Sequence, residues 1–268
     1  MALTEAIVVR AATADDYADF ARLSPQVGSG DPTPAEEAWR STMVPGTRVA
    51  AIGERVVGYC YFQELTDSGY VRNVVDDAAA RRRGAGRALM QATADELRAR
   101  GKTTWRLNVK PDNAGAIALY AAFGMKAAYL GKGFFLRWRH LTDLPSYGAT
   151  INVAGAERDV ALEDAFALPR GQLARSRSAG RTIFEALGAG APGAILGVAD
   201  FNPRFPGAFP FRVVDPRVAR DLLAAMRALV PADEAVYLTT EDNEPLADLL
   251  VRTGATLRME VLHMVGPL

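Results

Sequence analysis

The sequence predicts a mixed α/β chain in which strands and helices alternate and the whole pattern occurs twice. Apolar runs with strand character alternate with segments whose apolar residues recur at spacings of three and four. Two apolar runs around Gly53-Glu54-Arg55 predict a β-hairpin. The spacing Asn113-x10-Gly124 recurs as Asn243-x10-Gly254, and apolar residues follow the Asn at helical spacing in both places. The chain therefore looks like a tandem repeat of one domain.

The first half contains enough elements for one complete domain. Thr13 is a suitable N-cap for the first helix, and Gly101 and Gly124 follow the ends of the two later ones. We expect two strands between Lys126 and Trp138, broken around Gly131-Lys-Gly133. The other expected strands are 7–10, 48–52, 56–62, 70–75 and 104–109, and the expected helices are 13–23, 35–42, 84–99 and 113–123.

Residues 140–149 contain Pro145, Ser146 and Gly148 and predict a linker. The predicted division is therefore a first domain over 1–139, a linker over 140–149 and a second domain over 150–268. In the second half the expected strands are 150–153, 194–201, 209–214, 235–239 and 256–265, and the expected helices are 157–168, 172–187, 216–230 and 244–253.

Composition excludes several classes of protein. Lys and Arg total 31 and balance 31 Asp and Glu, so no overall field attracts nucleic acid or an acidic membrane. The single cysteine, Cys60, excludes an internal disulfide and a Cys-rich metal site. With two histidines, a His-rich metal site is not expected either. No apolar run reaches the ~20 residues of a membrane span, and the N-terminus lacks a signal-peptide pattern. We expect a cytoplasmic protein without a metal.

A loop of arginines and glycines follows the predicted strand 70–75. It contains Arg81, Arg82, Arg83, Gly84, Ala85, Gly86 and Arg87, and a helical pattern begins behind it. Glycine lets the backbone approach a ligand closely and reaches dihedrals that other residues avoid. A helix N-terminus adds unpaired N–H donors and a partial positive charge. This combination predicts a site for a pyrophosphate group.

Two familiar phosphate loops do not fit. A P-loop ends in Gly-Lys-Ser/Thr, whereas Gly86 is followed by Arg87-Ala88. A dinucleotide fingerprint needs a third glycine where Leu89 stands. A basic turn that only caps a surface helix is the alternative interpretation.

Two signatures together resemble the GNAT superfamily of N-acetyltransferases. Arg81-x-x-Gly84-x-Gly86 is similar to its cofactor loop, and the strand, Asn113, Tyr120 and Gly124 of segment 107–125 are similar to its second signature. The resemblance covers roughly residues 4–140. It implies a mixed, mostly antiparallel central sheet flanked by helices, with the element order β-α-α-β-β-β-α-β-α-β-β, and acetyl-CoA as co-substrate.

The resemblance also implies roles for individual residues. The backbone of Val74, Val75 or Asp76 would donate to the thioester oxygen, and the loop from Arg81 to Arg87 would hold the pyrophosphate, mostly through N–H groups. Asn113 would contact the cofactor, cap its helix, or do both. Tyr120 would give a proton to the leaving thiolate, since a phenol and a thiol have similar pKa values. The alternative for Tyr120 is packing on an apolar helix face.

The sequence does not assign a general base. Glu64, Asp76 and Asp77 are candidates near the central strands, although each is more often a solvated carboxylate at a strand end. Asp76 departs from the family pattern, which has an apolar residue at this distance before the loop. Cys60, in mid-strand, is expected to be a packing residue.

The second copy is expected to lack the cofactor site. Its loop position reads Val214-Asp-Pro-Arg, without glycine. Asp215 before Pro216 predicts a helix cap that occupies the donors a phosphate would need. Leu250 stands where the first copy has Tyr120.

The expected function is transfer of an acetyl group from acetyl-CoA to a primary amine of a small molecule or peptide, with catalysis in the first domain. A non-catalytic acyl-CoA sensor is the alternative. No nucleic acid or membrane partner is expected, and the chain would be a monomer or homodimer. The residues do not distinguish among amine acceptors.

Overall fold

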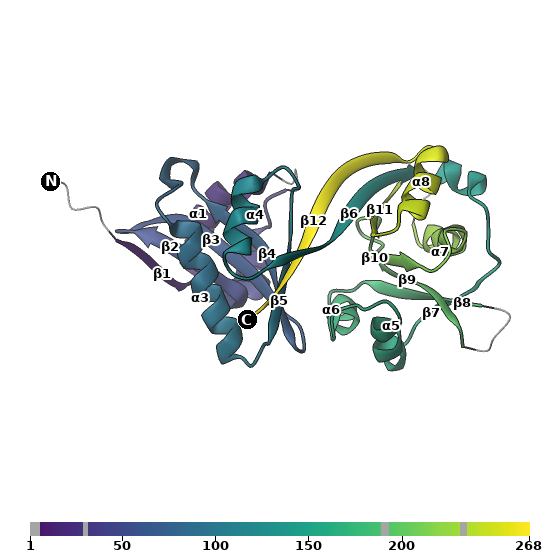
Figure 1. Ribbon diagram of the computed structural model, residues 1–268, viewed down its shortest axis with the longest axis horizontal. Helices are drawn as coiled ribbons and strands as arrows, with labels where there is room; N and C mark the ends of the chain where they lie inside the picture. Colours follow the sequence, from purple (N-terminus) through teal and green to yellow (C-terminus); the bar gives the residue numbers. More distant parts are fainter. Residues whose placement is uncertain (1–5, 29–31, 189–192, 231–234) are drawn as a thin grey trace. The chain divides into compact units, whose positions relative to one another are not determined.

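The computed structural model describes residues 6–28, 32–188, 193–230 and 235–268, which fall into two compact units (Figure 1). The first unit comprises Met1–Ala127 together with Met264–Leu268, and the second comprises Ala128–His263. The chain thus returns to the first unit at its C-terminal end. This division differs from the one predicted around a linker at 140–149, because Leu144 is buried in the core of the second unit.

The sheet of the first unit has five strands in the order β1-β2-β3-β4-β5, and the end of β12 lies beside β5. Neighbours are antiparallel except β4 and β5, which are parallel. The strands are β1 (Ile7–Ala11), β2 (Thr47–Ile52), β3 (Arg55–Glu64), β4 (Ser68–Asp76), β5 (Thr104–Val109) and β12 (Thr256–Pro267). The helices are α1 (Tyr17–Leu23), α2 (Glu36–Ala38), α3 (Ala85–Ala99) and α4 (Ala114–Ala121).

Helices cover both faces of this sheet. The amphipathic helix α3 buries Leu89, Met90 and Leu97 against the central strands, as its spacing of apolar residues predicts. On the other face, Phe20 of α1 stacks on Trp39 with ring centroids 4.5 Å apart and meets Tyr59 of β3 edge-on at 5.2 Å. The packing on these two faces of the sheet fixes the central strand β4.

The second unit repeats this plan with the strand order β12-β6-β11-β10-β9-β8-β7. Here β10 and β11 are the parallel pair. Its strands are β6 (Lys126–Arg137, from Ala128 on), β7 (Thr150–Val153), β8 (Thr182–Leu187), β9 (Ile195–Asn202), β10 (Gly207–Val213) and β11 (Ala235–Glu241). Its helices are α5 (Asp159–Ala165), α6 (Gln172–Ser178), α7 (Val218–Arg227) and α8 (Glu244–Arg252).

The predicted tandem repeat is present in detail. Asn113 and Asn243 each cap the following helix, with the side-chain oxygen accepting from the N–H three residues on, at 3.1 and 3.0 Å. Gly124 and Gly254 follow these helices with φ of 78° and 89°. Only glycine adopts that left-handed conformation without strain, so both glycines end their helices for the same reason.

Two sequence-based expectations are wrong. Segment 126–138 is one strand, because Gly131 and Gly133 pair with Glu241 and Thr239 in the sheet instead of turning. A Cβ on Gly133 would lie 2.6 Å from the Met259 side chain, so this glycine makes room for a neighbouring strand.

The predicted helix 172–187 ends at Ser178 and gives way to β8. Gly180, with φ of 76°, breaks the helix, and the β-branched and aromatic residues Thr182-Ile-Phe184 continue as strand. Within the described part of the chain, no helix is both long and apolar enough to cross a membrane.

Candidate functional site

The strands β4 and β5 separate halfway along their length. Their parallel pairing runs from Ser68 and Thr104 to Val71 and Leu107, although β4 continues to Asp76 and β5 to Val109. Beyond Val71 the facing edge of β4 has no strand partner among the described residues. Unpaired backbone groups at such an edge need another hydrogen-bonding partner, so this opening is a natural place for a ligand.

The register decides which N–H groups face the opening. The Asp77 N–H donates to the Val57 carbonyl of β3 at 2.7 Å. Because N–H directions alternate along a strand, the Val75 N–H also points to β3. The N–H groups of Val74 and Asp76 therefore point into the opening, and of the three backbone positions singled out in the sequence these two are suitably directed.

The arginine loop follows directly and has an unusual backbone. Arg82 and Gly84 both have positive φ, 61° and 92°. Left-handed residues alternating with ordinary ones turn successive N–H groups toward one side and form an anion-binding concavity. The left-handed conformation is uncommon for a residue other than glycine, so Arg82 adopts it at a cost that the rest of the loop must offset.

The loop also carries uncompensated charge. Its four arginines are exposed, and within the described residues none of them forms an ion pair. The Arg87 guanidinium lies 5.7 Å from the centre of the Phe123 ring. The four are Arg81, Arg82, Arg83 and Arg87. Their positive charge is free to attract an anion.

The two loop glycines have different structural roles. A Cβ on Gly84 would meet nothing within 4 Å, so this glycine is required by its positive φ and leaves open space beside the loop. A Cβ on Gly86 would lie 3.0 Å from the Asp76 carboxylate and 3.4 Å from Leu119. Gly86 is therefore needed for packing inside the unit, whereas the sequence had suggested close approach of a ligand at both positions.

Helix α3 begins at the buried Ala85, immediately behind the loop. Its Gly86 N–H is already bonded, because it donates to Asp76 Oδ2 at 3.2 Å. The N–H groups of Ala85 and Arg87 make no hydrogen bond to any other described residue. The N-terminus of α3 thus keeps donors for an anion.

Asp76 has one satisfied and one unsatisfied oxygen. Its Oδ1 is buried and has no hydrogen-bond partner in the described structure, while Oδ2 accepts from Gly86. Burial raises the pKa of this carboxyl, and the Gly86 N–H and the Arg81 charge oppose that shift. The side chain lies against Gly58 and Gly86 on the α3 face, away from the Phe20–Trp39 cluster.

The other two carboxylates considered as bases are engaged elsewhere. Glu64 pairs with Arg100 and Lys102. Asp77 accepts from the Ala79 N–H at 3.0 Å and pairs with Arg22 and Arg55 at 2.7 and 2.9 Å.

The hydrogen bond from Ala79, assisted by the two arginines, lowers the pKa of Asp77. The pKa shifts of Asp76 and Asp77 thus have opposite directions, and the general base stays unassigned.

Tyr120 projects from α4 and is 7% exposed. Its hydroxyl makes no hydrogen bond to a described residue and is not among the fully buried polar atoms. Burial raises its pKa, and the nearby Cys60 and Asp76 add to the shift, so the phenol is neutral at physiological pH. Cys60 itself is fully buried, and burial raises the pKa of its thiol to about 12, as expected for a packing residue.

Asn113 certainly caps α4, while its side-chain NH₂ has no partner among the described residues. Asn243, its counterpart, uses both ends of its amide. It caps α8 and also donates from Nδ2 to the Val213 carbonyl of β10 at 3.2 Å. The first-unit Asn therefore keeps donors available that the second-unit Asn has already used.

The second unit closes its own strand opening, a feature the sequence did not reveal. β10 and β11 pair only over Gly207–Ala208, so they separate as β4 and β5 do. Arg212 Nη1 donates across the opening to the Glu241 carbonyl at 3.1 Å, and the two side chains form an ion pair at 2.9 Å. Together with the Asn243–Val213 bond, these contacts satisfy two backbone carbonyls at the opening and place side chains across it.

The predicted cap before α7 is also present. Asp215 Oδ1 accepts from the Arg217 N–H at 2.9 Å, and the Arg217 side chain lowers the pKa of Asp215. Leu250, at the position of Tyr120, is fully buried in the apolar core. Across the described residues, no group of three His, Cys, Asp or Glu side chains could hold a metal ion.

Comparison with known proteins agrees with this geometry. Residues 14–125 match the model described as "Acetyltransferase (GNAT) family". The [ribosomal protein bS18]-alanine N-acetyltransferase of Salmonella typhimurium is 34% identical over 82 residues, which are 31% of this chain and 55% of that protein. The chain thus spans about half the length of the curated relatives it matches.

Solved structures resemble the whole chain. A putative acetyltransferase from Pyrococcus horikoshii has a TM-score of 0.70 at 17% identity, over 98% of this chain and 89% of that one. A tandem GNAT protein from the clavulanic acid biosynthesis pathway has a TM-score of 0.60 at 20% identity, over 98% of both chains. At these identities the likeness concerns the fold, and it extends the tandem arrangement to both units.

Replacing Asp76 by Asn tests the buried carboxyl. A raised folded-state pKa means that ionised Asp76 destabilises the protein above that pKa, and that this effect fades as pH falls toward the ordinary value of 3.8. Asp76→Asn keeps an acceptor for Gly86. It should raise the free energy of unfolding at pH 7.5 by at most ~1 kcal/mol, because solvent screens part of the charge.

Urea unfolding at pH 7.5 and near pH 4 measures this effect, and the gain should shrink at the lower pH. Asp95→Asn, at an exposed position of α3, is the control and should show no gain. A loss of stability in Asp76→Asn at pH 7.5 would mean that the ionised carboxylate holds the loop in place.

The two equivalent caps provide a second test. Asn113→Ala removes one cap hydrogen bond and should lower the free energy of unfolding by ~1 kcal/mol. Asn243→Ala removes the cap and the bond to Val213, so it should cost about 2 kcal/mol. Chemical denaturation of both variants measures the difference. Equal losses would show that the Asn243–Val213 bond contributes nothing to stability.

Proposed function

This chain belongs to the GNAT family of acetyltransferases, and we propose that its first unit transfers an acetyl group from acetyl-CoA to a primary amine of a small molecule or peptide. The observation that carries the proposal is the open edge of β4, where the N–H groups of Val74 and Asp76 face an unpaired stretch beside the arginine loop. A thioester and a pyrophosphate both need such donors. In the first unit the N–H donors of β4 and of the arginine loop lie on one continuous segment.

The cofactor chemistry fits the residues that are present. Acetyl-CoA supplies an acetyl thioester and an anionic diphosphate. The left-handed loop, the open space at Gly84 and the four unpaired arginines suit the diphosphate. The side-chain NH₂ of Asn113, free of other described partners, would donate to the arm between these two groups.

The proposed catalytic roles follow from geometry and charge. The N–H of Val74 or Asp76 would donate to the thioester oxygen as it gains negative charge. The Tyr120 phenol would give its proton to the departing sulfur. Its raised pKa keeps it protonated in the free enzyme, so the proton is in place before the reaction begins. The amine must lose its own proton through a group or water not yet assigned.

The second unit would bind no acetyl-CoA. Its strand opening is crossed by Arg212, Glu241 and Asn243, and the end of α7 is capped by Asp215. A cofactor would have to break these contacts before it gained any of its own. We therefore propose one cofactor site in each chain.

A peptide amine is a sensible first acceptor to test. The curated relative is named for N-acetylation of an alanine in ribosomal protein bS18. Its likeness covers 31% of this chain. Free polyamines, amino acids and aminoglycosides belong in the same panel, since the acceptor side is set by other parts of the chain.

The cofactor site can be tested at Gly84. Titration calorimetry should find one acetyl-CoA per chain, and Gly84→Ala should weaken its binding at least ~10-fold, because Ala resists the left-handed conformation that opens the loop. Gly101→Ala is a matched control. Gly101 follows the other end of α3, has φ of 73° and has equally open surroundings, so it carries the same strain without the proposed contact.

Equal affinities of the Gly84 and Gly101 variants would contradict the loop assignment. Two sites per chain would contradict the proposal for the second unit.

Tyr120→Phe tests the proton donor. Turnover should fall about 100-fold, a typical contribution of a general acid, while the Kd for acetyl-CoA changes less than ~2-fold. Thiol release with the amine panel measures turnover. Tyr59→Phe is the control, since Tyr59 is also buried but faces the Phe20–Trp39 cluster on the opposite side of β3.

Parallel losses of turnover and affinity in Tyr120→Phe would indicate packing. Acetyl-CoA binding without turnover on any amine would favour the sensor function instead.

A further inference from the structure

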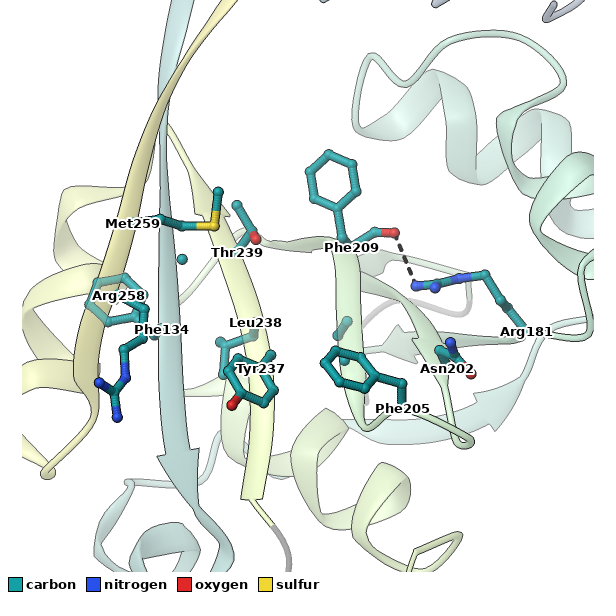
Figure 2. Close-up of a pocket in the computed structure, with 13 residues that line it drawn as sticks. Phe134, Arg181, Asn202, Phe205, Phe209, Tyr237, Leu238, Thr239, Arg258 and Met259 are labelled. Atoms are coloured by element: carbon teal, nitrogen blue, oxygen red, sulfur yellow. Dashed lines mark hydrogen bonds between the residues drawn. The ribbon is translucent and has the colours of Figure 1, made fainter. Parts of the chain in front are cut away.

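The second unit contains a hollow of about 180 Å³ that the acetyltransferase site does not use. It lies over β6, β10 and β11, beside β12, and all its lining residues belong to the second unit (Figure 2). Phe134 and Leu238 form part of its wall and also belong to the apolar core that includes α7 and α8. Tyr237 and Thr239 alternate with Leu238 and point to the opposite face, into the hollow.

Exposed aromatic side chains line one side of this hollow. Phe205 is 62% exposed and Tyr237 is 43% exposed, and their rings stack with centroids 5.5 Å apart and 13° between the planes. Met259, 53% exposed, lies across from them (Figure 2). Large apolar side chains that cluster on the surface often mark a binding site.

The hollow has several hydrogen-bond donors, and two of them, the arginines, carry positive charge. Two arginines, Arg181 and Arg258, line it, and no acidic residue does. Arg258 forms no ion pair within the described chain; its guanidinium lies 5.4 Å from the centre of the Phe135 ring. The Asn202 oxygen already accepts from the Arg204 N–H at 3.1 Å, which leaves the amide NH₂ as the free end.

Arg181 is held rigidly at the rim. Its Nε meets the buried carboxylate of Asp200, and its Nη2 donates to the Asp200 carbonyl at 2.8 Å and toward the Phe209 carbonyl at 3.4 Å (Figure 2). Its Nη1 has no partner among the described residues. A fixed guanidinium with a spare N–H is preorganised for an anionic oxygen.

Size limits the ligand further. A cavity of about 150 Å³ accommodates one benzene ring, so this hollow suits one ring with a small substituent. We propose that the second unit binds an aromatic carboxylate here, with the ring beside Phe205 and Tyr237 and the carboxylate toward Arg181. This inference does not depend on acetyl transfer in the first unit.

The test uses the full chain and 4-fluorophenylacetate, followed by ¹⁹F NMR titration. We expect saturable binding with a Kd on the order of 1 mM or tighter for so small a probe. Tyr237→Ala should weaken it about tenfold through lost ring contact, and Arg181→Gln about fivefold through loss of the guanidinium. Neutral 4-fluorophenethyl alcohol should bind at least ~5-fold more weakly than the carboxylate, because it lacks the charge.

Controls separate this site from other surfaces. Tyr147→Ala removes a tyrosine of similar exposure, 41%, outside the hollow, and Arg252→Ala removes an exposed arginine of α8. Neither should change the Kd, and saturating acetyl-CoA should leave the titration unchanged. Phe205→Ala provides a second variant if Tyr237→Ala does not fold, and thermal unfolding checks both.

Three results would overturn the proposal. The first is absence of saturable binding up to the solubility limit of the probe. The second is binding that Tyr237→Ala and Phe205→Ala leave unchanged. The third is displacement of the probe by acetyl-CoA, which would place it in the first unit.

Discussion

The interaction on which the site depends is the hydrogen bonding of a strand edge. In each unit two parallel strands pair for a few residues and then separate, β4 from β5 and β10 from β11. A backbone N–H or C=O that loses its strand partner must find another partner or remain costly. The second unit supplies partners from its own side chains, Arg212 and Asn243. In the first unit, the N–H groups of Val74 and Asp76 have no strand partner among the described residues, and the open edge continues into the arginine loop.

The same contrast extends to charge. In the second unit, arginines at comparable positions are neutralised by nearby acids, as Arg212 is by Glu241 and Arg217 by Asp215. In the first unit the loop from Arg81 to Arg83 has no such partner within the described structure. Two copies of one fold thus differ in whether their polar groups are satisfied internally. That difference, more than the fold itself, separates a binding site from a structural domain.

Much of this could be predicted from sequence because it is local. The caps at Asn113 and Asn243, the glycines at 124 and 254 and the arginine loop are set by neighbours within a few residues. One of the two errors came from a long-range contact. Gly133 was interpreted as a break in a strand, whereas it makes room for Met259.

The closure by Arg212 and Glu241 could not be found from spacing either, because 29 positions separate these residues and only the sheet brings them together. The ring pair Phe205–Tyr237 depends on sheet neighbours in the same way.

A carboxylate at the start of a helix does not by itself decide whether an anion can bind there. Asp76 and Asp215 each accept from one N–H near a helix N-terminus. Their pKa values nevertheless shift in opposite directions. Burial raises the pKa of Asp76, whereas the Arg217 side chain lowers the pKa of Asp215. An approaching diphosphate would raise both further.

Burial disfavours the charged form of Asp76, so proton uptake is easier there than at an exposed carboxyl and can remove the repulsion between the carboxylate and the anion. For Asp215 the partner arginine stabilises the charge, and the repulsion stays. The first helix end can therefore accept an anion that the second one rejects, even though both begin beside an aspartate.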